Sequence, residues 1–294
     1  MQLFQQVHFK KRLAYRKVKT ILIKSTFLLA TLFSIAILIL LIIRILMEGI
    51  PSVNLNFLMN KLSTNPTRAG IMGAILGTLW LMLIIIPITG FIGIGTAIYL
   101  EFYIKEGPIK SLIQTNISNL SGVPSIVYGI LGMTIFVRAM ELGNVILAGG
   151  LTMSLLILPI IIVASQEALK AVPNHLYDAS ITLGATKGQT IQQVILPVAL
   201  PSILTGAILA YSRAIGETAP LTVIGIPALL IPFPNSLFDR FTTLPMQIYY
   251  WTLDAALVEE YANLAAATII VLLCILFSLN IIAILLRNKF QINI

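Results

Sequence analysis

The chain of 294 residues is 58% hydrophobic and only 10% charged, whereas about a quarter of the residues in ordinary soluble domains are charged. This composition excludes a water-soluble globular fold and indicates that lipid surrounds most of the chain. The 19 basic and 11 acidic residues leave a formal net charge of +8. Seven of the cations precede the first apolar segment, at Lys10, Lys11, Arg12, Arg16, Lys17, Lys19 and Lys24. Such a cluster is typical of a cytoplasmic tail beside anionic lipid, so we expect a lipid membrane and no nucleic acid as its partner.

A membrane-spanning helix needs about 20 predominantly apolar residues, and the sequence contains six stretches of this kind. They lie at approximately Ser25–Met47, Gly70–Leu100, Ile117–Val137, Val145–Val163, Pro201–Ile226 and Asn263–Leu286. The first is too long for the apolar core of a signal peptide and no small-residue cleavage site follows it, so we interpret it as a retained helix. The predicted fold class is therefore all-α, a polytopic membrane protein with six transmembrane helices.

The cations outside these segments give an orientation. With the N-terminus inside, 13 cations lie on the cytoplasmic side and 4 on the outer side. The inner set adds Lys105, Lys110, Lys170, Lys187, Arg287 and Lys289 to the seven above, and the outer set is Lys61, Arg68, Arg138 and Arg240. Because positive charge accumulates in cytoplasmic loops, both termini are predicted to be cytoplasmic. Arg44 lies near the outer end of the first helix, where it can snorkel, and Arg213 remains inside the membrane.

This arrangement divides the chain into three parts. They are a basic cytoplasmic N-terminal tail at 1–24, a transmembrane domain at 25–286 and a cytoplasmic C-terminal tail at 287–294. Two outer loops, about Glu48–Ala69 and Pro227–Ala262, are rich in Pro, Asn and aromatic residues and lack helix or strand periodicity. We interpret them as candidate docking surfaces. The single cysteine, Cys274, lies in an apolar run and is expected to pack as a small hydrophobe.

The second and third segments carry helix-breaking residues. Toward its cytoplasmic end the second contains Pro87, Gly90, Gly93 and Gly95. These residues predict a tilt, kink or break there. Nearer its outer end, Gly73 and Gly77 have the spacing that lets two helix backbones approach closely. The third segment contains Ser121-Gly-Val-Pro-Ser125, where Pro124 removes a backbone donor, so an interruption at membrane depth is predicted. Broken helices tend to line cavities.

The cytoplasmic loop 166–197 has the pattern of two short helices. Pro173 suits the first position of a helix, and Gly184 suits the position after its end, where the backbone turns left-handed. Between them an apolar face at helical spacing comprises Leu176, Ala179 or Ser180, and Leu183. A second helix is predicted to start with the capping-box pattern Thr186-Lys-Gly-Gln189 and to end at Pro197. The alternative is an ordinary connector lying on the membrane surface, although a connector does not require this capping chemistry.

Resemblance to a known family rests first on this loop. Asp178-Ala-Ser180, Gly184 and Val194-Ile-Leu-Pro197 resemble the EAA loop of ABC-importer permeases, with Asp in place of the usual Glu. The resemblance implies a type I ABC-importer permease architecture in which the loop docks in a groove of a cytoplasmic ATPase. The residues implied in this coupling are Asp178, Ala179, Ser180, Gly184, Leu196 and Pro197. The shorter acidic side chain makes a salt bridge to the ATPase less assured than the docking of the helix.

Three further segments narrow the resemblance. Pro124-Ser-Ile-Val-Tyr-Gly129, Ser212-Arg-Ala-Ile-Gly-Glu-Thr-Ala-Pro-Leu221 and Leu244-Pro-Met-Gln-Ile-Tyr249 are similar to the phosphate-uptake permeases of the Pst system. The Thr-Ala-Pro-Leu ending is similar to the A-type subunit. Membership would imply a plasma-membrane complex with four kinds of partner. These are a homologous C-type permease subunit, two copies of a cytoplasmic ATP-binding-cassette ATPase, an extracytoplasmic phosphate-binding protein and inorganic phosphate.

The sequence lacks the patterns of an enzyme. No Gly-x-x-x-x-Gly-Lys-Ser/Thr pattern occurs, so ATP hydrolysis would have to come from another subunit. The two histidines, His8 and His175, have no zinc-ligand spacing, and no serine lies in a nucleophile-elbow pattern. We therefore expect neither a catalytic site nor a metal or cofactor in this chain.

Arg213 and Glu217 are ionisable groups inside the predicted fifth helix. From Pro201, twelve residues at about 1.5 Å each place Arg213 about 18 Å into a hydrocarbon core of about 30 Å. A charge at that depth costs about 2.5–3.5 kcal/mol, which favours pairing or a water-filled path. Their i, i+4 spacing allows a mutual salt bridge. Two interpretations remain open: the pair holds the fifth helix against its neighbours, or Arg213 offers a positive site to phosphate while Glu217 competes for the guanidinium.

Three alternative functions follow from what the residues leave open. The chain could be a permease for another oxyanion, such as molybdate or sulfate. It could be a secondary transporter driven by an ion gradient, with Arg213–Glu217 as a proton-linked pair, although this leaves the loop pattern unexplained. A non-transporting scaffold or sensor is disfavoured by the intramembrane charges.

Overall fold

The computed structural model describes residues 2–227 and 233–289, and within these ranges the regular structure is helical apart from an isolated antiparallel bridge between Val145 and Arg240. The α-helices are α1 (Gln2–Gly49), α2 (Leu55–Met59), α3 (Met72–Ile98), α4 (Pro108–Ser121), α5 (Ser125–Gly132), α6 (Ile146–Lys170), α7 (Asn174–Thr182), α8 (Lys187–Thr190), α9 (Leu196–Gly216), α10 (Ala219–Ile224), α11 (Leu244–Asp254) and α12 (Glu260–Lys289). Three π-helical turns lie at Tyr99–Tyr103, Met133–Ala139 and Ile191–Ile195, and 3₁₀ turns lie at Ile50–Ser52 and Pro66–Arg68.

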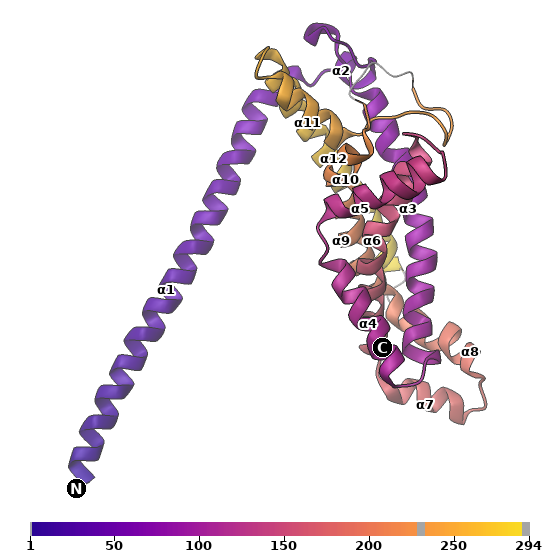
Figure 1. Cartoon of the computed structure of the whole chain (residues 1–294). Helices are drawn as coiled ribbons and strands as arrows, with labels where there is room; N and C mark the ends of the chain where they lie inside the picture. Colours follow the sequence, from indigo (N-terminus) through magenta and orange to yellow (C-terminus); the bar gives the residue numbers. More distant parts are fainter. Residues whose placement is uncertain (1, 228–232, 290–294) are drawn as a thin grey trace. The chain divides into compact units, whose positions relative to one another are not determined.

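The chain divides into two compact units, Met1–Glu48 and Gly49–Ile294. The first unit is α1 up to Glu48, which carries the first predicted span and continues it toward the N-terminus through most of the basic tail. Near the end of this unit Arg44 Nε lies 2.8 Å from Glu48 Oε1. In the second unit α7 and α8 lie at one end, and α2 and α11 lie toward the other (Figure 1). The predicted topology requires such a separation of inner and outer loops.

The predicted spans are present in the described residues. Five helical stretches are long and apolar enough to cross a membrane, and there are six if a bent pair forms one span. That pair is Pro108–Ser121 and Ser125–Ala139, which meet at an angle of 100°. The break lies at the predicted interruption, because Pro124 cannot donate a helical hydrogen bond and marks the start of α5. The prediction of an all-α polytopic fold is confirmed.

The second span has no break at its predicted helix-breaking residues, while a tilt or kink there stays a prediction. Helix α3 continues unbroken through Pro87, and the change of geometry comes later, at the π-helical turn Tyr99–Tyr103. Gly77 also has a different role from the helix packing that was predicted. A Cβ atom at Gly77 would lie 2.0 Å from the backbone oxygen of Thr242, so the glycine lets the segment before α11 approach α3. The tertiary partner is thus an irregular segment rather than a second helix.

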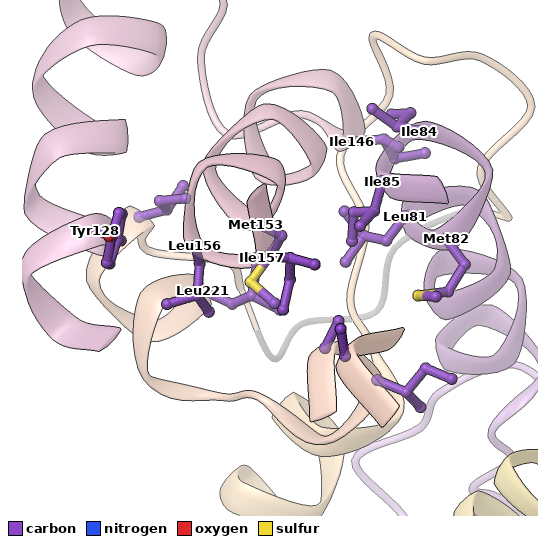
Figure 2. Packing of buried hydrophobic residues seen from close by; sticks show 14 of the residues in the cluster. Leu81, Met82, Ile84, Ile85, Tyr128, Ile146, Met153, Leu156, Ile157 and Leu221 are labelled. Carbon is purple, nitrogen blue, oxygen red and sulfur yellow. The ribbon is translucent and has the colours of Figure 1, made fainter. Parts of the chain in front are cut away.

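The central packing of the second unit joins α3 to α6. Leu81, Met82, Ile84 and Ile85 of α3 lie in one cluster with Met153, Leu156 and Ile157 of α6, Tyr128 of α5 and Leu221 of α10 (Figure 2). All of these side chains are buried. Without a hydrophobic driving force between helices in lipid, such close packing is what holds spans together.

Three details of the structure differ from the sequence expectations. Helix α6 runs to Lys170, beyond both the predicted end of its span and the predicted start of the cytoplasmic loop. The second outer loop, expected to be irregular, contains α11, which has Pro245 in its first turn; residues 228–232 of this loop lie outside the described residues. Cys274 is exposed on α12 rather than packed inside the chain, so it faces lipid or another subunit.

Candidate functional site

The cytoplasmic loop folds as the predicted helix–turn–helix. Helix α7 follows Pro173, which is its N-cap rather than its first helical residue. At its C-terminal end Gly184 has φ of +89°, the left-handed conformation that was predicted. The Gly184 N–H donates to Ile181 O at 2.9 Å, and the Ala185 N–H donates to Ser180 O at 3.2 Å. This pair of bonds is the Schellman motif, so the turn has a defined geometry.

Helix α8 starts with the predicted capping box. The Thr186 N–H donates to Gln189 Oε1 at 2.9 Å, and the Gln189 N–H donates to Thr186 Oγ1 at 3.4 Å. The hydroxyls of Ser180 and Thr190 lie 2.9 Å apart and join α7 to the segment after the turn. The prediction that Pro197 ends this helix is wrong. The π-helical turn Ile191–Ile195 carries the chain directly into α9, and Pro197 lies in the first turn of α9, where a missing N–H is tolerated.

The loop presents both apolar and charged side chains at its surface. Asp178 and Ala179 are exposed, while Leu196 and Pro197 are half-buried at the start of α9. Leu183 is 88% exposed, so the predicted apolar face of α7 does not extend to it within this chain. Leu183 therefore leaves an apolar side chain exposed at the end of α7.

A cavity that sequence reasoning missed lies beside this surface. It has a volume of about 460 Å³ and is lined by the ends of α3 and α6 and by α7. Asp178 lines it together with Glu101 of the π-helical turn at the end of α3. Glu101 Oε2 is buried without a hydrogen-bond partner. No sequence pattern pointed to Glu101 as a lining residue of this cavity, because only the fold places it at the same cavity as Asp178.

Arg213 and Glu217 form the predicted ion pair, with Arg213 Nε 3.1 Å from Glu217 Oε1. They do not share a helix, however. Helix α9 ends at Gly216, and Glu217 is its C-cap residue with extended backbone angles. The side chain of Arg213 is 52% exposed and that of Glu217 is 17% exposed. The Glu217 side chain is therefore largely enclosed by the protein, while about half of the Arg213 side chain is open to what lies outside the chain.

Neighbouring polar groups fix the rotation of α9. The Tyr211 hydroxyl lies 3.2 Å from Ile86 O and 3.2 Å from the Thr89 hydroxyl, both in α3. The Ser212 hydroxyl lies 2.7 Å from Asn280 Oδ1 in α12. Because α9 is hydrogen-bonded on two sides immediately before Arg213, the direction in which the guanidinium projects is set by the fold.

The two broken spans meet beside the ion pair. After the break at Glu217 the chain forms α10, which packs against α5. A Cβ atom at Gly129 of α5 would lie 2.8 Å from Pro220 Cα of α10, so only glycine fits this contact. The sequence segments Pro124–Gly129 and Ser212–Leu221, which are far apart in the chain, are thus brought together. Discontinuous helices that meet in this way are a common way of building transport sites.

Comparison with known proteins identifies the family. Residues 91–291 match the family described as "Binding-protein-dependent transport system inner membrane component". The probable ABC transporter permease protein YqgI of Bacillus subtilis is 32% identical over 206 residues, which cover 70% of each chain. The phosphate transport system permease protein PstA 2 of Mycobacterium bovis is 36% identical over 152 residues, which cover 52% of this chain and 50% of that protein.

A further relative is longer than this chain. The phosphate transport system permease protein PstA homolog of Mycoplasma pneumoniae is 32% identical over 210 residues, 69% of this chain but 32% of that protein. Among solved structures, the MetNI methionine ABC transporter in an inward-facing conformation matches with a TM-score of 0.60 at 17% identity, covering 76% of this chain and 96% of that chain. At this identity the likeness concerns the fold, which is that of type I ABC-importer permeases. The chain therefore belongs to the binding-protein-dependent transport system inner membrane components, multi-pass permeases that are not themselves catalytic and that work with ATPase subunits and a binding protein.

Proposed function

We propose that this chain is the A-type permease subunit of an ATP-driven phosphate importer and forms half of its translocation pathway. The observation that carries the proposal is the ion pair Arg213–Glu217, in which the Arg213 side chain is half exposed and the Glu217 side chain is largely enclosed. Several relatives at 32–36% identity are described as phosphate transport permeases, which supports phosphate as the substrate.

In this proposal Arg213 is the residue that contacts phosphate. A guanidinium can hold a phosphate through two parallel charge-assisted hydrogen bonds, and it stays charged whatever its surroundings. Glu217 competes for the same guanidinium, since the two are already 3.1 Å apart. Competition of this kind keeps the anion from being trapped, which transport requires.

The cytoplasmic turn is the proposed coupling element. Asp178, Ala179 and Ser180 of α7, followed by Gly184, present a rigid surface to the ATPase, and Leu196 and Pro197 join this surface to α9. Since α8, the π-helical turn and α9 form one continuous helical run from Lys187 to Gly216, a displacement of the turn is transmitted to Arg213 without an intervening loop. The proposed assembly pairs this chain with a homologous C-type permease, two copies of the ATPase and an outer phosphate-binding protein.

Reconstitution tests this proposal directly. The chain is assembled in liposomes with its candidate permease partner and ATPase, and the binding protein is loaded with labelled phosphate. We expect uptake that requires ATP and that excess unlabelled phosphate suppresses, while sulfate and molybdate do not. Suppression by sulfate or molybdate instead would identify another oxyanion as the substrate, and uptake without the ATPase would overturn the importer assignment.

A further inference from the structure

Buried polar atoms without partners cluster before and within α11. Among the described residues five buried side-chain polar atoms lack a hydrogen-bond partner, and three of them lie between Thr242 and Gln247. They are the hydroxyls of Thr242 and Thr243 and the Oε1 atom of Gln247. An unsatisfied buried polar atom costs about 1–3 kcal/mol, so such a group calls for an explanation.

The Thr243 hydroxyl makes none of the hydrogen bonds that its position usually provides. Thr243 is the N-cap residue of α11, and an N-cap hydroxyl normally accepts a hydrogen bond from the second or third helical N–H. Here the second helical residue is Pro245, which has no N–H, and the side chain of Thr243 makes no capping bond. The first N–H, that of Leu244, donates to the Thr78 hydroxyl at 3.0 Å. The Thr243 hydroxyl is therefore left available, although the residue is only 1% exposed.

This hydroxyl and Glu217 share one cavity. Thr243 and Glu217 both line a small, partly open space of about 10 Å³ between α3, α9, α10 and the start of α11. A space of this size holds about one water molecule, which needs two to four polar partners. Thr243 supplies a hydroxyl and Glu217 supplies a carboxylate. Arg213 lies 3.1 Å from Glu217 but does not line the cavity, so Glu217 is the residue that the ion pair and the cavity have in common.

We propose that Thr243 is a positioning residue for Glu217, which it holds through one water in the shared cavity when an anion occupies Arg213. The proposal rests on the proposed function, in which the anion displaces Glu217 from the guanidinium. A displaced carboxylate would otherwise be left unpaired next to an incoming anion, which is strongly unfavourable. The water donates to the carboxylate and accepts from the Thr243 hydroxyl, so the displaced state keeps a hydrogen-bonded Glu217 in place for the next cycle.

A thermal-stability cycle tests this pairing without any substrate. In the assembled complex Arg213→Gln removes the guanidinium, so Glu217 depends on Thr243. Adding Thr243→Val should then lower the Tm by about 2–4 °C, whereas in the Arg213→Gln, Glu217→Gln background the same change should have a clearly smaller effect. Equal shifts in the two backgrounds would overturn the proposal. Thr243→Ser, which keeps the hydroxyl, should behave as the parent does, and this separates loss of the hydroxyl from loss of folding.

Uptake supplies the second measurement. Thr243→Val in the otherwise wild-type complex should reduce the maximal uptake rate about tenfold, as expected for the loss of a hydrogen bond to a charged group, and Thr243→Ser should restore it. The matched control is Thr242→Val, because Thr242 is 2% exposed and has an unpaired hydroxyl, yet does not line the cavity. An equal loss in Thr242→Val would contradict a specific role for Thr243. Absence of phosphate uptake by the wild-type complex would refute the proposed function alone, since the stability cycle does not use phosphate.

Discussion

Replacement of Arg213 by glutamine distinguishes a transport site from a structural ion pair. The amide keeps hydrogen-bond donors but loses the charge that offsets the desolvation of an anion. If Arg213 contacts phosphate, Arg213→Gln should abolish uptake while the complex still assembles. Glu217→Gln should have a milder effect, because it removes only the competitor for the guanidinium.

The magnitude of the assembly defect follows from the surroundings of the pair. The pair has i, i+4 spacing, and half of the Arg213 side chain is open to what lies outside the chain. If that side is a water-filled pathway, the pair contributes no more than about 1 kcal/mol to stability. If the pair instead holds helices together in lipid, the remaining charge costs about 2.5–3.5 kcal/mol. That cost corresponds to about 70- to 400-fold less assembled complex.

Two assays on the same preparations distinguish a transport site from a structural ion pair. Assembly is measured by co-purification of the partner permease and the ATPase, and transport is measured by phosphate uptake into liposomes. The double variant Arg213→Gln, Glu217→Gln is the decisive one, because removing both charges should restore a structural site but cannot restore an anion-binding site. Wild-type uptake by the fully assembled double variant would refute phosphate contact by Arg213.

Two further predictions concern the turn and the topology. Gly184→Val should uncouple ATP hydrolysis from uptake, because the left-handed turn at φ +89° resists a β-branched residue. The control is Gly188→Val, since Gly188 also lies in open space but has no positive φ. Equal uptake by the two variants would refute the role of the turn. In a Cys274→Ala background, a membrane-impermeant thiol reagent should label Phe238→Cys in intact cells and miss Lys187→Cys, as the cation asymmetry requires. The opposite labelling would reverse the topology.

Local chemistry in the sequence was enough to predict the cytoplasmic turn. Gly184 and the Thr186–Gln189 pair act on the backbone within a few residues, so their caps form as predicted. The break at Pro124 could also be predicted, because the missing N–H of a proline removes a hydrogen bond from the helix that contains it. The spans themselves follow from length and hydropathy, which lipid imposes on any chain.

Other features did not follow from the residue patterns that the sequence shows. Pro197 was predicted to end a helix, but a π-helical turn absorbs the missing N–H and lets α9 continue. The i, i+4 spacing of Arg213 and Glu217 predicted their ion pair. The end of α9 at Gly216 was not predicted, because it accompanies the packing of α10 on α5. No sequence pattern pointed to Thr243 as a candidate site residue. The sequence thus predicted the apolar spans and the capped turn between α7 and α8, because these depend on near neighbours and on the surrounding lipid, while only tertiary packing placed Thr243 and Glu217 at one cavity.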